Sequence, residues 1–130
     1  MKQHILVIED DPDHRVLIKT MLEKAGYKVF EAPNGKEGLQ LFYQQPCNLV
    51  ITDIFMPEKE GLETILELKR QFPTVKIIAI SGGTRWSKHN GVDSALEAAQ
   101  EFGANYILKK PIKIQQLLTI VDEILKVKDQ

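Results

Sequence analysis

The sequence lacks the features that mark secreted, membrane-embedded or nucleic-acid-binding proteins. Its single cysteine, Cys47, allows neither an internal disulfide nor a zinc site built from several thiolates. The longest apolar runs, such as residues 5–8, have four residues, whereas a membrane-spanning helix needs roughly 20. The 17 basic and 18 acidic residues give a net charge of −1, without the basic excess that favours nucleic-acid binding. With no secretion signal evident at the amino terminus, we expect a cytoplasmic protein whose partners are neither nucleic acid nor membrane.

Length and composition indicate a single globular domain. The chain has 130 residues, of which 43% are hydrophobic and 27% are charged, a balance typical of soluble domains. This is the size of one ordinary domain and leaves no room for a second. We therefore expect residues 1–130 to fold as one unit.

Short apolar segments alternate with helical ones along the chain. Runs of apolar, often β-branched residues predict strands at 5–8, 27–30, 49–51, 77–80 and 106–108, with 27–30 as an edge strand. Apolar spacing and capping residues predict helices from Asp11-Pro12 to Gly26, at about 34–43, from Gly61 to before Pro73, from near Ser94 to 102, and at 114–125. The fourth start rests on the capping-box spacing of Ser94 and Glu97. This alternation predicts an α/β domain with helices on both faces of a parallel sheet.

Polar and charged residues stand where four of these strands end. They are Glu9 and Asp10 after the first strand, Asp53 after the third, Ser81 after the fourth and Lys110 after the fifth. Ligands of an open parallel sheet bind at this edge. If the first and third strands are neighbours, about 4.8 Å apart, their carboxylates crowd together and resist ionisation. Mg²⁺, which prefers carboxylate and phosphate oxygens, would relieve that repulsion.

The remaining strand ends suit a phosphoryl group. The hydroxyl of Ser81 can donate a hydrogen bond to a phosphoryl oxygen, and the ammonium of Lys110 can neutralise its charge. Phosphoryl transfer needs little more than positioning and charge neutralisation. Asp53 can act as the nucleophile, because aspartyl phosphates are established covalent intermediates.

Together these motifs resemble the receiver domain of two-component response regulators. The resemblance rests on Ile-Leu-Val-Ile-Glu-Asp-Asp-Pro-Asp at 5–13, Asp-Ile-Phe-Met-Pro at 53–57 with Gly61, Ser81, and Lys110-Pro111, in that order, and it covers the whole chain. It implies a flavodoxin-like, doubly wound sheet of five strands in the order 2-1-3-4-5 with five helices. It further implies a stand-alone signalling switch, phosphorylated by a histidine kinase or histidine phosphotransfer protein, that acts by binding a downstream target protein.

By motif position, the resemblance assigns a role to each site residue. Asp53 would accept the phosphoryl group, and Ser81 and Lys110 would contact its oxygens. Mg²⁺ would be held by Asp10, by Asp53, by the backbone carbonyl of Phe55 and, through water, by Glu9. The Lys110–Pro111 peptide bond would be cis. Such a domain would catalyse its own phosphorylation and hydrolysis, but it would be a signalling module and not a turnover enzyme.

The sequence departs from the family pattern at two places. The switch position on the fifth strand, usually an aromatic residue, is Ile107, while Tyr106 is one residue early and points to the other face. The connection at 82–91 is also longer than is common in the family and contains Trp86. We expect any specialised partner surface to involve Trp86 and Tyr106.

Two other functions fit parts of this pattern. A receiver fold that is never phosphorylated would be a constitutive binding module, which Ile107 and the long connection favour mildly. A small aspartate-nucleophile phosphatase would explain Asp11-Pro12-Asp13, but His14 and Arg15 replace the residues expected there.

Residues outside the motifs have simpler interpretations. The three histidines, His4, His14 and His89, lack ligand spacing and are expected at the surface. Lys109 is interpreted as a solvated neighbour of Lys110, and Cys47 as a small, half-buried residue before the third strand.

Overall fold

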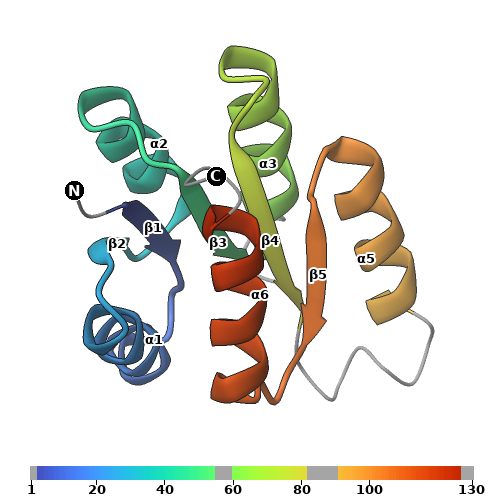
Figure 1. Cartoon of the computed structure of the whole chain (residues 1–130). Coiled ribbons are helices and arrows are strands. Elements are labelled where there is room, and N and C mark those ends of the chain that lie inside the picture. Colours follow the sequence, from blue (N-terminus) through green and yellow to red (C-terminus); the bar gives the residue numbers. More distant parts are fainter. Residues whose placement is uncertain (1–2, 55–59, 82–90, 127–130) are drawn as a thin grey trace.

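The protein is a five-stranded parallel sheet with helices on both faces. The computed structural model describes residues 3–54, 60–81 and 91–126. The strands are β1 (His4–Ile8), β2 (Lys28–Ala32), β3 (Leu49–Asp53), β4 (Lys76–Ser81) and β5 (Tyr106–Lys109), in the sheet order β2-β1-β3-β4-β5. All neighbouring pairs are parallel, so the predicted fold class and strand order are confirmed (Figure 1).

Within the described residues, four helices connect consecutive strands and a fifth follows β5. They are α1 (Pro12–Lys24), α2 (Gly35–Gln44), α3 (Glu60–Gln71), α5 (Gly91–Phe102) and α6 (Ile114–Lys126). In Figure 1, α6 lies in front of the sheet and α3 behind it. No helix of this part of the chain is long and apolar enough to cross a membrane.

The alternation of side chains along the strands produces two separate cores. On one face, Leu6, Val50 and Ile77 pack with Ile65 of α3 and Phe42 of α2. On the other face, the intervening strand residues pack with apolar residues of α1 and α6; the buried members from these two helices are Ile18, Leu22, Leu117, Val121 and Leu125. Because β1, β3 and β4 are covered on both sides, their sequences are almost continuously apolar.

Local capping determines where several elements begin and end. The side chain of Asp11 accepts hydrogen bonds from the backbone N–H groups of Asp13 and His14, so it is the N-cap of α1, as predicted. Gly26 follows the helix with φ of +103°, a conformation that favours glycine. The Lys110–Pro111 bond is cis, as the resemblance implied.

Several predicted boundaries were wrong; β3 and β4 are each two residues longer than predicted, and α5 and β2 also differ. Helix α5 begins at Gly91, so Ser94 lies inside it and is not its N-cap. A Ser-x-x-Glu spacing also occurs within helices, because residues three apart share a face there. The edge strand β2 runs from Lys28 to Ala32 and not over 27–30, since Glu31 and Ala32 still pair with β1.

Candidate functional site

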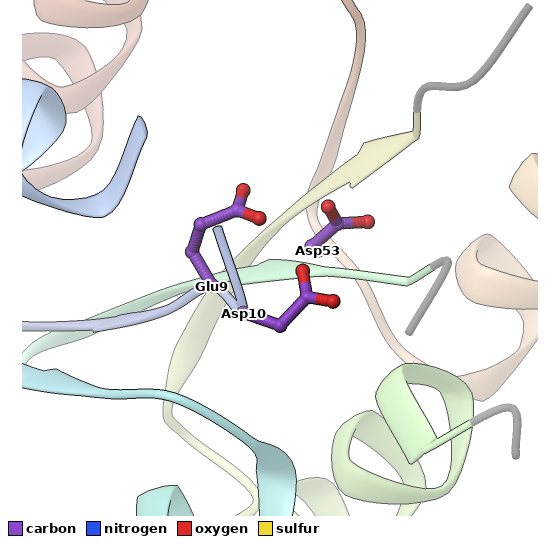
Figure 2. A group of neighbouring side chains, drawn as sticks. All are labelled: Glu9, Asp10 and Asp53. Carbon is purple, nitrogen blue, oxygen red and sulfur yellow. The ribbon is translucent and has the colours of Figure 1, made fainter. Parts of the chain in front are cut away.

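Three carboxylates meet where β1 and β3 end. Glu9 and Asp10 follow β1, Asp53 is the last residue of β3, and the pairing of Ile8 with Thr52 brings these ends together. One carboxylate oxygen from each residue lies within 4.8 Å of the other two (Figure 2). Glu9 and Asp53 are buried and Asp10 is exposed. Oxygen ligands so spaced, with one side open to solvent, are compatible with a metal site.

The Glu9 carboxylate is unusual in being almost completely buried, with 1% of its surface exposed. Burial raises the pKa of Glu9 above its ordinary value, and the nearby charge of Asp53 raises it further. Hydrogen bonds from His14 and the Asp11 backbone N–H, together with the charge of Lys110, act in the opposite direction. Burial thus makes the charged form of Glu9 unfavourable, and a bound cation would offset that effect.

Lys110 links the acidic residues to the far end of the sheet. Its Nζ donates a hydrogen bond to Asp53 Oδ2 at 2.8 Å and lies 3.3 Å from Glu9 Oε1. Burial by itself would lower the pKa of Lys110, but its interactions with Asp53 and Glu9 outweigh burial and raise it. The backbone N–H of Lys110 also donates to the carbonyl of Ser81 at 2.7 Å. This hydrogen bond holds the residue after β5 next to the end of β4.

Ser81 is the last residue of β4, and its hydroxyl group has an unusual hydrogen-bonding environment. The residue is fully buried, and its Oγ has no hydrogen-bond partner among the residues that the structure describes. Buried hydroxyl groups are nearly always paired, because an unpaired one loses its hydration without compensation. The neighbouring strand β3 ends at Asp53, whose register partner on β4 is Ile80. In the described part of the chain, the hydroxyl is thus an unused donor on the neighbouring strand, one residue beyond the register partner of Asp53.

Helix α3 packs closely against the end of β3. At Gly61, a Cβ atom would overlap the carbonyl oxygen of Asp53 and the Cα of Ile54. Only glycine therefore allows the first turn of α3 to approach the strand this closely. This contact explains in physical terms why Gly61 accompanies Asp53 in the sequence motif.

Sequence reasoning missed two residues of the first turn of α1. His14 was predicted to be a surface residue, and this was wrong. Its side chain is only 20% exposed, and Nδ1 lies 2.9 Å from Glu9 Oε1. Arg15 Nη1 donates to the backbone carbonyl of Glu9 at 2.7 Å, and its Nε donates to Glu31. The N-cap signal at Asp11 gives the start of α1 but not the direction in which His14 and Arg15 point.

The remaining predicted residues are spread over the domain. Ile107 is half-buried against the core on the α3 and α5 side, and Tyr106 is 40% exposed. Lys109 is exposed. Cys47 is half-buried, as predicted, and burial raises the pKa of its thiol to about 11. His4 is also half-buried, with its ring edge-on to Phe30. Predictions for Phe55, Trp86, His89 and most of the 82–91 connection fall outside the described residues.

Comparison with known families agrees with this geometry. The model of the response regulator receiver domain matches residues 5–122. The chain belongs to this family. It therefore carries a receiver domain, the signalling module of two-component systems.

Relatives of this receiver domain include both short and long proteins. The response regulator receiver protein CpdR of Brucella abortus is 31% identical, and the match covers 95% of this chain and 97% of CpdR. The transcriptional regulatory protein ZraR of Klebsiella oxytoca is also 31% identical over 93% of this chain, but the chain spans only 26% of ZraR. The receiver domain is thus shared by proteins of different overall length.

Solved structures show the same fold. A CheY-like receiver domain protein from Methanospirillum hungatei aligns with a TM-score of 0.88 at 26% identity, over 99% of this chain and 98% of that one. A receiver domain protein from Clostridium thermocellum aligns with a TM-score of 0.84 at 30% identity, over 98% and 97%. The agreement extends over the whole sheet and its helices.

Proposed function

We propose that this receiver domain is a phosphorylation switch and that Asp53 is its phosphoacceptor. A carboxylate oxygen of Asp53 attacks the phosphorus of a phosphohistidine on a histidine kinase or histidine phosphotransfer protein. A P–O bond forms and the P–N bond breaks, with the electron pair and then a proton taken up by the departing imidazole. One observation carries the proposal. The carboxylates of Glu9 and Asp10 lie next to that of Asp53, and Lys110 donates a hydrogen bond to the same Asp53 carboxylate.

The acidic residues would hold Mg²⁺ for this reaction. By motif position, Asp10 and Asp53 would offer carboxylate oxygens directly, and Glu9 would act through a water molecule. Phe55, which lies outside the described residues, would add its backbone carbonyl. The spacing of the three carboxylates and the raised pKa of Glu9 support a divalent cation here. When bound, Mg²⁺ would neutralise charge on the phosphoryl oxygens.

Ser81 and Lys110 would hold the phosphoryl group after transfer. The unpaired hydroxyl of Ser81 has hydrogen-bonding capacity for a phosphoryl oxygen, and Lys110 already contacts the acceptor carboxylate. Both would then interact with charge that is absent before the reaction, which is how such groups stabilise a transferred phosphoryl.

The output would be protein–protein binding in the cytoplasm. We propose that residues 1–130 work as one receiver unit, that Ile107 occupies the switch position, and that a downstream target protein binds near Tyr106 and Trp86. The exposure of Tyr106 at the outer strand β5 supports a contact there. In this role the domain is a signalling module and not a turnover enzyme, and it needs neither nucleic acid nor membrane.

Intact-mass analysis after incubation with acetyl phosphate tests the proposal. We expect one phosphoryl adduct on the wild-type protein with Mg²⁺, none with EDTA, and none on Asp53→Asn. An adduct that persists on Asp53→Asn would show that another residue is the acceptor. A folded wild-type protein that binds no Mg²⁺ and gains no adduct would instead favour the constitutive binding module, in which Ile107 replaces the usual aromatic residue.

A further inference from the structure

Glu9 is held by donors on each of its oxygen atoms. Oε1 accepts from His14 Nδ1 at 2.9 Å and lies 3.3 Å from Lys110 Nζ, while Oε2 accepts from the Asp11 backbone N–H at 3.2 Å. The backbone carbonyl of Glu9 accepts from Arg15 Nη1 at 2.7 Å. These hydrogen bonds therefore restrict the Glu9 side chain to one position.

The first turn of α1 places His14 next to the Glu9 carboxylate. The N-cap side chain of Asp11 accepts from the backbone N–H of His14 itself, at 3.4 Å, and from that of Asp13. Arg15, the next residue, joins the turn to the Glu9 backbone and to Glu31 on β2. The imidazole is consequently held between the helix and the acidic residues, with 20% of its surface exposed.

Lys110 cannot hold Glu9 in the same way throughout the proposed reaction. Its Nζ is shared between Glu9 and Asp53, and it is closer to Asp53, at 2.8 Å. Once Asp53 carries a phosphoryl group, that group competes for the ammonium. His14 is then the side-chain donor to Glu9 that does not depend on the reacting residue.

We infer that His14 is a positioning residue that holds the Glu9 carboxylate in place for divalent cation binding. This inference rests on the proposed function, because it assigns Glu9 to the surroundings of a bound Mg²⁺. Groups that hydrogen-bond to the residues around a metal orient their lone pairs, and losing one typically lowers metal affinity by 10- to 100-fold. His14 orients the Glu9 carboxylate, and Glu9 would reach the cation through a water molecule.

A matched pair of variants separates hydrogen bonding from packing. Asn and Leu have nearly the same shape, and the amide nitrogen of Asn can take the place of Nδ1. Mg²⁺ titration followed by backbone amide chemical shifts would measure affinity at one fixed pH. We expect His14→Leu to weaken Mg²⁺ binding by roughly tenfold, and His14→Asn to stay within about threefold of the wild type. The amide spectrum also reports folding, and His14→Ala replaces the Leu variant if the latter is unfolded.

The Glu9→Gln background tests whether His14 acts through Glu9. There, adding His14→Leu should change Mg²⁺ affinity by less than about twofold, because the carboxylate that it positions is gone. In acetyl phosphate reactions, His14→Leu should raise the half-saturating Mg²⁺ concentration and leave the rate at saturating Mg²⁺ unchanged.

Four outcomes would overturn the inference. Equal Mg²⁺ affinity in the wild type and His14→Leu, or equal weakening by Leu and Asn, would show that the hydrogen bond has no such role. An undiminished effect of His14→Leu in the Glu9→Gln background would show that His14 acts by another route. If the wild-type protein binds no Mg²⁺ at all, the proposed function fails and this inference fails with it.

Discussion

Lys110 Nζ lies 2.8 Å from Asp53 Oδ2, so the segment that follows β5 reaches past β4 to the end of β3. The same ammonium is 3.3 Å from Glu9 Oε1. One cation thus serves two buried carboxylates. This contact makes Lys110 a competitor of Mg²⁺ for the acidic residues and, in the proposed reaction, a partner of the phosphoryl group.

Replacing Lys110 should therefore separate metal binding from phosphorylation. In Lys110→Met, Mg²⁺ should bind several-fold more tightly, because a positive charge next to its ligands has been removed. Phosphorylation by acetyl phosphate at saturating Mg²⁺ should become about 100-fold slower, because a charge that stabilises the transferring group is lost. Amide chemical-shift titration and intact-mass kinetics measure the two effects.

The exposed neighbour Lys109 provides the matched control. Lys109→Met removes the same charge one residue away and should change both quantities by less than about threefold, since exposed charges are screened. Weaker Mg²⁺ binding in Lys110→Met would contradict the competition described above.

Removing the hydroxyl of Ser81 should change the free energy of unfolding. Ser81→Ala removes a buried hydroxyl that has no hydrogen-bond partner among the described residues, so the free energy of unfolding should rise by about 1 kcal/mol. Phosphorylation should become about tenfold slower. Thr52→Val is the contrast, because Thr52 Oγ1 donates to the carbonyl of Asp53. Thr52→Val should lower the free energy of unfolding by about 1 kcal/mol. Urea denaturation measures both, and a large loss of stability in Ser81→Ala would mean that the hydroxyl is already satisfied.

Glu9 should make the metal-free domain less stable as the pH rises. Its pKa in the folded protein is raised above the ordinary value of 4.5, chiefly by burial. The folded state then binds this proton more tightly than the unfolded chain does, so stability is lost as the pH increases through the interval between the two pKa values. Glu9→Gln removes this loss. In EDTA, the stability advantage of Glu9→Gln over the wild type should grow as the pH rises above about 4.5.

Urea denaturation of the two proteins across this pH range provides the measurement. The difference between the two curves removes the contribution of titrating groups that do not interact with Glu9. A difference that shrinks with rising pH would mean that the pKa of Glu9 is lowered in the folded protein.

Gly61 should tolerate no side chain. In Gly61→Ala the added Cβ meets backbone atoms of Asp53 and Ile54, so the helix or the strand end must move. We expect a loss of about 1–3 kcal/mol in the free energy of unfolding and weaker Mg²⁺ binding, because Asp53 shifts. Gly38→Ala is the control for overpacking: its Cβ would lie 2.5 Å from Ile8 Cδ1 and 2.8 Å from Ile8 Cγ1, which are side-chain atoms and not the backbone of Asp53. Equal Mg²⁺ affinities in the two variants would contradict this role for Gly61.

The strands and the residues at their ends were predictable because each signal is local. A buried parallel strand must be apolar on both faces, so residues 5–8 and 77–80 stand out in the sequence. Parallel pairing then places the ends of these strands at one edge, whatever the details of packing. That edge contains Glu9, Asp10, Asp53 and Lys110, whose proximity the structure confirms.

Contacts that depend on how a helix is rotated were not predictable. Whether His14 faces solvent or Glu9 is decided by the N-cap at Asp11 and by Arg15 reaching the Glu9 backbone. The start of α5 at Gly91 was missed because the Ser94–Glu97 spacing fits a helix interior as well as a cap. The unpaired state of Ser81 likewise depends on the packing around it, which no local pattern encodes.

Chemical mapping of the acceptor tests the central claim most directly. Borohydride reduces an aspartyl phosphate to homoserine, which marks the modified residue permanently. After reaction with acetyl phosphate and Mg²⁺, peptide sequencing by mass spectrometry should find homoserine at position 53 and aspartate at positions 10, 11 and 13. Homoserine at any of those three positions, with Asp53 unmodified, would contradict the account.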